Sequence, residues 1–120
     1  MHMARRLGIR AGATIAVVNE PPGFWSLLRP LPPGVEALER ASRPLDVLVY
    51  FSDDLENIER RIPAFGPMLN DGGTLWVGHP RDKIQTAYVD RAGARARLAT
   101  AELIDAGGGW LMRRLVKRAR

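Results

Sequence analysis

The chain has 120 residues, 46% of them hydrophobic and 26% charged, which are the proportions of an ordinary globular domain. The absence of cysteine excludes disulfides, thiolate catalysis and cysteine-ligated metals. No apolar run is long enough to span a membrane, and none follows the N-terminal arginines, so we expect a cytoplasmic protein without membrane contact. The length predicts a single domain over residues 1–120, with 1–6 as a flexible lead-in to which we assign no role.

The formal net charge of +5 comes from the two ends of the chain. Residues 1–43 carry six arginines against three glutamates, and residues 81–120 carry ten basic against four acidic side chains. Residues 44–80 reverse the balance, with two arginines against six acids. Arginine suits phosphate recognition, although a GC-rich genome would produce the same excess of arginine over lysine.

The first third of the chain predicts a strand, a short helix and a weak second strand. Residues 14–18 form an apolar run that is typical of a buried strand. Two prolines and a glycine follow it, and residues 24–28 then read as a short helix that Pro30 ends. Residues 35–41 fit either a short edge strand or a helical turn, and we favour the strand.

A strand–helix–strand unit occupies the centre of the chain. Residues 45–51 are rich in β-formers, and Asp53 and Asp54 supply N-cap chemistry for the helix that follows. The helix has an apolar face because hydrophobic residues recur at helical spacing, namely Leu55, Ile58, Ile62 and Phe65. We expect Asp71-Gly72-Gly73 to break the chain before a second strand over 74–77. Such a unit is right-handed, so its two strands are parallel.

The last third predicts one helix and a terminal hairpin. Asp82 is expected to cap a helix that runs to about Gly93. Residues 98–104 have β-character, and the glycine-rich turn 105–109 connects them to a last strand over 110–117. The last strand is therefore antiparallel to its neighbour.

This order of elements predicts a minimal doubly wound α/β fold, a mostly parallel sheet that ends in an antiparallel hairpin. Residues 68–77, MLNDGGTLWV, resemble the helix-to-strand passage of Rossmann-like S-adenosylmethionine-dependent methyltransferases. Over residues 7–118 the chain also resembles a family of small bacterial proteins described only as a domain of unknown function. That resemblance rests on Pro21-Pro22-Gly23-Phe24, on the turn Leu31-Pro32-Pro33-Gly34-Val35 and on the hairpin entry at Trp110.

The methyltransferase resemblance implies a cofactor loop after the first strand and an acidic residue after the second. Methyltransferases hold S-adenosylmethionine with a Gly-x-Gly-x-Gly loop and bind its ribose with that acid. The corresponding candidates for cofactor binding here are Asn19, Glu20, Gly23 and Glu39. Only one glycine remains and two prolines stiffen the loop, so we expect no cofactor, with S-adenosylmethionine as the alternative. We also expect Pro21 and Pro22 to fill the crevice, leaving it shallow, mixed in charge and too small for adenosine.

Ligands of open α/β sheets bind outside the carboxyl ends of the strands. Glu20, Asp53 and His79 follow three predicted strands, so they are the candidate catalytic residues of an acid–base set. A metal site is an alternative use of the same side chains, although we predict no metal. The structural interpretation makes Asp53 a helix cap, places His79 at a solvated strand end and pairs Glu20 with an arginine.

The basic C-terminal segment offers a nucleic-acid hypothesis. Arg113, Arg114, Lys117 and Arg118 are candidates for phosphate contacts, and Trp110 is available for stacking. The structural interpretation makes Trp110 the core anchor of the hairpin and the arginines its solvated face. Trp25 and Trp76 are likewise expected in the core.

Three functional hypotheses follow. The leading one is a non-catalytic or cofactor-poor methyltransferase-like domain that binds an unidentified small molecule or a protein partner. The second is a small enzyme that acts on a metabolite at the carboxyl edge of the sheet. The third is a nucleic-acid-binding protein that uses its basic termini.

Overall fold

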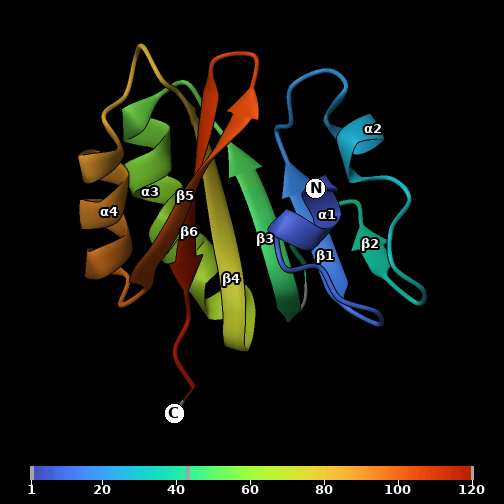
Figure 1. Ribbon diagram of the computed structural model, residues 1–120. Coiled ribbons are helices and arrows are strands. Elements are labelled where there is room, and N and C mark those ends of the chain that lie inside the picture. The colour runs from blue at the N-terminus through green and yellow to red at the C-terminus, as the bar shows by residue number, and fades with distance from the viewer. Residues whose placement is uncertain (1, 43, 120) are drawn as a thin grey trace.

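The computed structural model describes residues 2–42 and 44–119, which fold into a six-stranded sheet with helices on both faces (Figure 1). The strands are β1 (Thr14–Val18), β2 (Glu36–Leu38), β3 (Leu45–Phe51), β4 (Leu69–Pro80), β5 (Ala99–Gly107) and β6 (Trp110–Val116). The helices are α1 (Met3–Arg6), α2 (Phe24–Leu28), α3 (Leu55–Phe65) and α4 (Thr86–Arg95), with a 3-10 turn η1 (Gly66–Met68).

The strand order across the sheet is β2-β1-β3-β4-β6-β5. Strands β1 to β4 are parallel, whereas β6 is antiparallel to both β4 and β5. The predicted fold class, including the short strand β2 and the antiparallel hairpin, is therefore confirmed.

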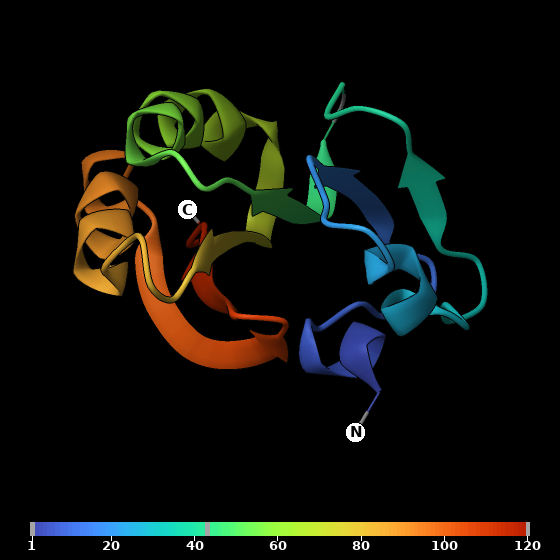
Figure 2. The same cartoon turned by 90° about the horizontal axis from the view of Figure 1, so that it is seen from above.

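Strand β3 divides the core into two layers because its side chains are buried on both faces. Leu48 and Tyr50 pack against α3 and α4, while Val47 and Phe51 pack on the side of α1 and α2. Figure 2 shows the two pairs of helices on opposite sides of the sheet. This double burial explains why β3 reads as a continuous apolar run in the sequence.

Helix α3 begins and packs as its sequence predicts. The Asp54 carboxylate accepts hydrogen bonds from the backbone N–H groups of Glu56 (2.9 Å) and Asn57 (3.4 Å), so it satisfies two otherwise unpaired donors. On the face of the helix that packs against the sheet, Ile58 and Ile62 are fully buried.

The expected break at residues 71–73 is wrong, because β4 begins at Leu69 and continues through these residues. The pairing register with β3 shifts between Leu45 and Val47, which accommodates extra residues of β4 without ending the strand. Gly73 is required at this irregularity, since a Cβ there would lie 2.8 Å from the Asn70 carbonyl oxygen.

The predicted cap of α4 is also wrong. The helix begins at Thr86 after Gln85, and Asp82 lies in the preceding turn. That turn forms because the backbone N–H groups of Lys83 and Ile84 both donate to the Pro80 carbonyl oxygen, which buries the Ile84 side chain.

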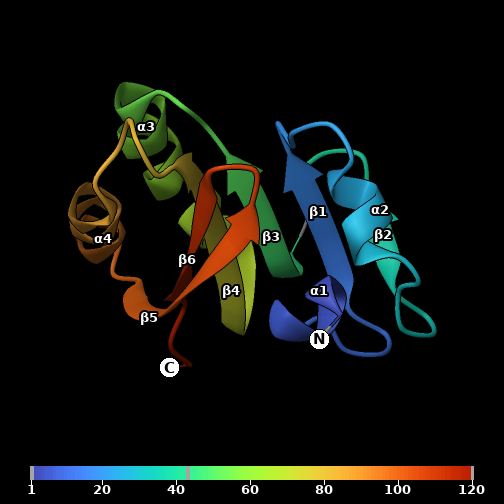
Figure 3. The same ribbon diagram turned by 45° about the horizontal axis from the view of Figure 1, so that its top comes forward.

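The N-terminal segment differs from the expected flexible lead-in. His2 caps α1 by accepting a hydrogen bond from the backbone N–H of Ala4, and its Nε2 lies 2.6 Å from the Arg29 carbonyl oxygen. Met3 and Ala4 are buried, and the Trp76 indole donates to the carbonyl oxygen of Leu7 at 3.0 Å. Apolar side chains therefore hold this segment against the sheet (Figure 3), while Met1 lies outside the described residues.

The face of the sheet that carries α3 and α4 is covered unevenly. These helices lie over β3, β4 and the hairpin (Figure 2), whereas only six residues of sequence separate the end of β2 from the start of β3. Six residues are too few for a crossover helix. Within the described part of the chain, no helix is long and apolar enough to cross a membrane.

Candidate functional site

A groove lies at the carboxyl ends of β1 and β2, beside α3, with a volume of about 610 Å³. We call it the strand-end groove. Its lining residues come from the ends of β1 and β2 and from one side of α3 and η1: Val17–Glu20, Glu39–Ala41, Arg60, Arg61, Ala64, Phe65 and Met68. The short connection between β2 and β3 leaves this part of the sheet open.

The loop after β1 is held by two side-chain hydrogen bonds. Asn19 has a left-handed backbone (φ 60°), and its side-chain amide donates to the Phe51 carbonyl oxygen at 2.8 Å. This bond joins the ends of β1 and β3. The Glu20 carboxylate accepts from the Trp25 indole N–H at 2.7 Å, so its partner is a tryptophan rather than the expected arginine.

Three of the four candidate cofactor-binding residues border the strand-end groove. Asn19 and Glu20 line it just after the end of β1, and Glu39 lines it just after the end of β2. Gly23 does not line the groove but is the N-cap of α2, with a left-handed φ of 85°. The single remaining glycine of the loop therefore serves the turn into a helix.

The walls of the strand-end groove carry both signs of charge. Glu20 and Glu39 lie on the sheet side, while Arg60 and Arg61 project from α3. The Arg61 guanidinium lies 5.9 Å from the centre of the Phe65 ring, which orients a cation beside an aromatic wall. The mixed charge agrees with the sequence prediction. The volume does not agree with the predicted small size, because about 610 Å³ falls within the range of roughly 300–1,000 Å³ that small-molecule sites occupy.

The two loop prolines do not fill this groove. Pro21 and Pro22 line a separate hollow of about 390 Å³ between α2, the end of β3 and the terminal hairpin. We call it the aromatic hollow because the Phe51 ring packs edge-on against two other rings there. Its centre lies 4.8 Å from the centre of the Phe24 ring and 5.3 Å from that of the Trp110 ring. The expectation that the prolines block the crevice is wrong because the loop turns toward α2.

The three candidate catalytic residues have separate partners. Glu20 bonds to Trp25, as described above. The exposed Asp53 carboxylate lies 3.5 Å from the Lys83 ammonium, and it does not cap α3, which is the role of Asp54. His79 is fully buried rather than solvated, with Nε2 2.9 Å from the Thr86 hydroxyl.

Burial lowers the pKa of His79 below its ordinary value, so the neutral imidazole is favoured. Its other ring nitrogen lies 3.2 Å from the Pro80 carbonyl oxygen. The ring therefore joins the end of β4 to the start of α4. Across residues 2–42 and 44–119, no group of three histidine or acidic side chains is placed to hold a metal ion.

The four candidate nucleic-acid contacts do not form one basic surface. Arg113 pairs with Asp90 of α4 (2.8 Å), whereas Arg114 projects from the other face of β6 and pairs with Glu102 (3.1 Å). The Lys117 ammonium donates to the Leu69 carbonyl oxygen at 2.8 Å, and Arg118 is exposed. Arg120 lies outside the described residues.

Sequence reasoning missed the arginines of α3 as part of the site. Arg60 and Arg61 directly precede the buried Ile62, and the sequence analysis assigns them no role. The available signal was the short spacing between β2 and β3, which leaves no room for a crossover helix beside α3.

Comparison with solved structures finds methyltransferases of similar architecture. The chain aligns with a methyltransferase from Pyrococcus furiosus at a TM-score of 0.64 and 10% identity, covering 97% of this chain and 80% of that one. The ribosomal protein L11 methylase from Lactobacillus delbrueckii subsp. bulgaricus gives a TM-score of 0.70 at 14% identity, covering 96% and 74%. A methyltransferase solved in complex with the Haloferax volcanii Trm112 methyltransferase activator gives 0.70 at 12% identity, covering 99% and 88%.

No protein-family model matches the sequence, and no curated protein matches it. The structural similarity at such low identity establishes the fold alone. The chain therefore has a Rossmann-like, methyltransferase-like fold.

Proposed function

We propose that the chain is a non-catalytic binding domain on a methyltransferase-like fold, and that its small-molecule ligand lies in the strand-end groove. The observation that carries this proposal is the arrangement of polar side chains there. Asn19, Glu20 and Glu39 follow two adjacent strands and border one groove, opposite the arginines of α3. Carboxylates on one wall and guanidinium groups on the other suit a ligand with hydroxyl or amino groups at one end and an anionic or planar group at the other.

The separate partners of the candidate catalytic residues support a binding role. A general base must come within hydrogen-bond reach of the proton that it abstracts. His79 is buried against Thr86, and the Asp53 carboxylate faces Lys83, so neither lines the strand-end groove. The alternative of a small enzyme that uses these residues with Glu20 has no such geometric support.

The loop after β1 supports the proposal that this domain lacks the usual cofactor. The resemblance to methyltransferases requires glycines there, so that the backbone approaches the methionine part of S-adenosylmethionine. Here the one glycine of the loop, Gly23, is the N-cap of α2 and does not line the groove. Glu39, in contrast, lies where the resemblance places the ribose-binding acid, so S-adenosylmethionine is the alternative ligand.

Calorimetric titration with adenosine and with S-adenosylmethionine separates these two ligands. We expect adenosine to bind weakly, and S-adenosylmethionine to bind no tighter, because its methionine part finds no glycine loop. Glu39→Gln should weaken both, whereas Glu59→Gln, an exposed α3 residue outside the groove, should change neither. If S-adenosylmethionine bound about tenfold tighter than adenosine, about 1.4 kcal/mol, the loop would recognise the methionine part and the cofactor-poor proposal would fail.

The protein-partner alternative has support from one comparison, since a structural neighbour was solved with a protein activator. The nucleic-acid alternative has less support, because its four basic candidates do not form one surface and Arg113 is held by Asp90 of α4. A gel shift at low salt tests it, since binding through phosphate contacts is strongest there.

A further inference from the structure

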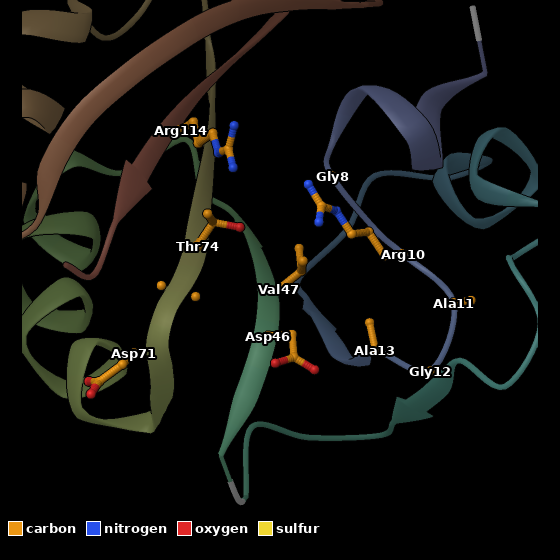
Figure 4. A pocket seen from close by; sticks show the side chains of 12 residues that line it. Gly8, Arg10, Ala11, Gly12, Ala13, Asp46, Val47, Asp71, Thr74 and Arg114 are labelled. Atoms are coloured by element: carbon orange, nitrogen blue, oxygen red, sulfur yellow. The ribbon is translucent and has the colours of Figure 1, made fainter. Parts of the chain in front are cut away.

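A second polar hollow lies at the opposite edge of the sheet, where the parallel strands begin (Figure 4). We call it the amino-edge hollow, and its volume is about 420 Å³. Its walls come from the segment before β1 and from the starts of β3 and β4, with one residue of β6: Gly8, Arg10–Ala13, Asp46, Val47, Asp71–Thr74 and Arg114.

Two arginines direct their guanidinium groups toward the same space. Figure 4 shows Arg10 and Arg114 on opposite sides of the hollow, with their side chains pointing inward. The Arg10 guanidinium has no hydrogen bond or ion pair with any of the described residues. Arg114 uses one terminal nitrogen to bind Glu102, and its buried Nε has no partner in the same part of the chain.

A buried hydroxyl belongs to the lining of the same hollow. The Thr74 side chain is on the floor of the hollow, and Figure 4 shows its oxygen turned toward Val47 and Arg10. Thr74 is only 3% exposed, and its hydroxyl has no hydrogen-bond partner among residues 2–42 and 44–119. Buried hydroxyls in folded proteins are normally hydrogen-bonded, so this one points to a partner outside the chain.

The nearby acids occupy only part of the two guanidinium groups, because Glu102 binds a single terminal nitrogen of Arg114. Asp46 already accepts two hydrogen bonds, from the backbone N–H of Thr14 (2.9 Å) and from the Asn70 amide (3.0 Å). The Asp71 carboxylate points away from the arginines in Figure 4. An anion would therefore meet two guanidinium groups and a hydroxyl donor without displacing a carboxylate from them.

We propose that the amino-edge hollow binds the phosphate group of a small phosphorylated metabolite. Guanidinium forks match phosphate oxygens in geometry and charge, and the Thr74 hydroxyl adds a neutral donor. The volume of the hollow is within the range of small-molecule sites, which leaves room for an organic part of the ligand as well as the phosphate. Gly8 lines the hollow, and its left-handed backbone (φ 77°) is one that favours glycine over residues with a side chain.

This site is separate from the strand-end groove and does not rest on the function proposed for that groove. The two lie at opposite ends of the parallel strands, and their lining residues do not overlap. A failure of one proposal therefore leaves the other standing.

The test is calorimetric titration with glycerol 3-phosphate, with glycerol as the uncharged control and inorganic phosphate as the minimal probe. We expect both phosphates to bind at millimolar concentrations or below, and glycerol not to bind. Arg10→Gln and Arg114→Gln should each weaken glycerol 3-phosphate binding about tenfold, as expected for the loss of one charge-assisted contact. Arg5→Gln is the matched control, because Arg5 is exposed and outside the hollow.

Thr74→Val separates a ligand-binding hydroxyl from one that is merely left unpaired in the core. If the hydroxyl binds phosphate, this nearly isosteric change raises the melting temperature of the free protein and weakens glycerol 3-phosphate binding. A raised melting temperature with unchanged binding would overturn the role of Thr74. Binding that persists in both arginine variants, or the binding of single-stranded RNA without glycerol 3-phosphate, would overturn the site itself. Arg10 is exposed, so its variant tests the site even if Arg114→Gln fails to fold.

Discussion

His79 Nε2 lies 2.9 Å from the Thr86 hydroxyl, so a fully buried imidazole joins the last part of β4 to the first residue of α4. Thr86→Val removes this partner and leaves a buried ring nitrogen unpaired. We expect the free energy of unfolding to fall by about 1–3 kcal/mol. Urea denaturation followed by circular dichroism measures the loss, and a change within experimental error would contradict a structural role for this bond.

The same histidine predicts an acid-dependent loss of stability. Burial lowers the pKa of His79 in the folded state, so the unfolded chain binds a proton more readily. Stability is therefore complete above the unfolded pKa of about 6.5 and is lost as the pH falls toward the lower folded pKa. Melting temperatures between pH 8 and about pH 5 check this, and His79→Gln should flatten the dependence across that interval.

The bond between Trp25 and Glu20 should contribute to the stability of the loop after β1. Trp25→Phe deletes the indole donor and keeps an aromatic ring at the half-buried site. We expect a loss of about 1 kcal/mol, the net value of one hydrogen bond, or somewhat more because the acceptor is charged. Glu20→Gln, which keeps an acceptor oxygen, should cost less than Trp25→Phe, and the reverse order would contradict this account.

Replacing Pro21 and Pro22 with glycines should not create binding of S-adenosylmethionine. The two prolines line the aromatic hollow, so their removal leaves the strand-end groove unchanged. We expect each substitution to cost about 0.4–1 kcal/mol, because glycine gives the unfolded chain more freedom. Calorimetric titration of the double variant checks the first expectation, and new micromolar binding would mean that the prolines do block a cofactor.

Gly78→Ala should be strongly destabilising although it adds one methyl group. A Cβ at Gly78 would lie 2.4 Å from an atom of the Phe51 ring, which packs between Phe24 and Trp110. We expect a loss of about 1–3 kcal/mol from overpacking. Gly72→Ser is a useful comparison, since nothing lies within 4 Å of its Cβ position and only its left-handed backbone opposes the change.

The order of elements was predictable because the interior strands carry uninterrupted apolar runs. The buried β3 and the capped α3 are fixed by residues close in sequence, such as Asp54 and Ile58, and both were predicted correctly. The start of β4 was not, because Gly72 and Gly73 are read as a turn signal but lie in an irregular stretch of strand. Residues distant in sequence keep this stretch in the sheet, since the backbone N–H of Gly72 donates to the Lys117 carbonyl oxygen at 2.7 Å.

Sequence reasoning located candidate residues better than it assigned them partners. Asn19, Glu20 and Glu39 were placed at adjacent strand ends, and they do border one groove. Their contacts depend on tertiary packing, as with the indole of Trp25 that binds Glu20. The amino-edge hollow was missed because Arg10 and Arg114 are far apart in sequence and meet only after β6 pairs with β4.

The two outer strands of the sheet, β2 and β5, differ in how many unpaired backbone groups they offer to another chain. β2 has three residues, so it exposes a short row of backbone groups, whereas β5 has nine. The longer edge carries an exposed hydrophobic residue, Leu103, between the acidic side chains of Glu102 and Asp105. Charged residues on an edge strand oppose edge-to-edge aggregation. Neutralising Glu102 and Asp105 would therefore make the β5 edge the place where concentrated protein begins to form intermolecular β-sheet.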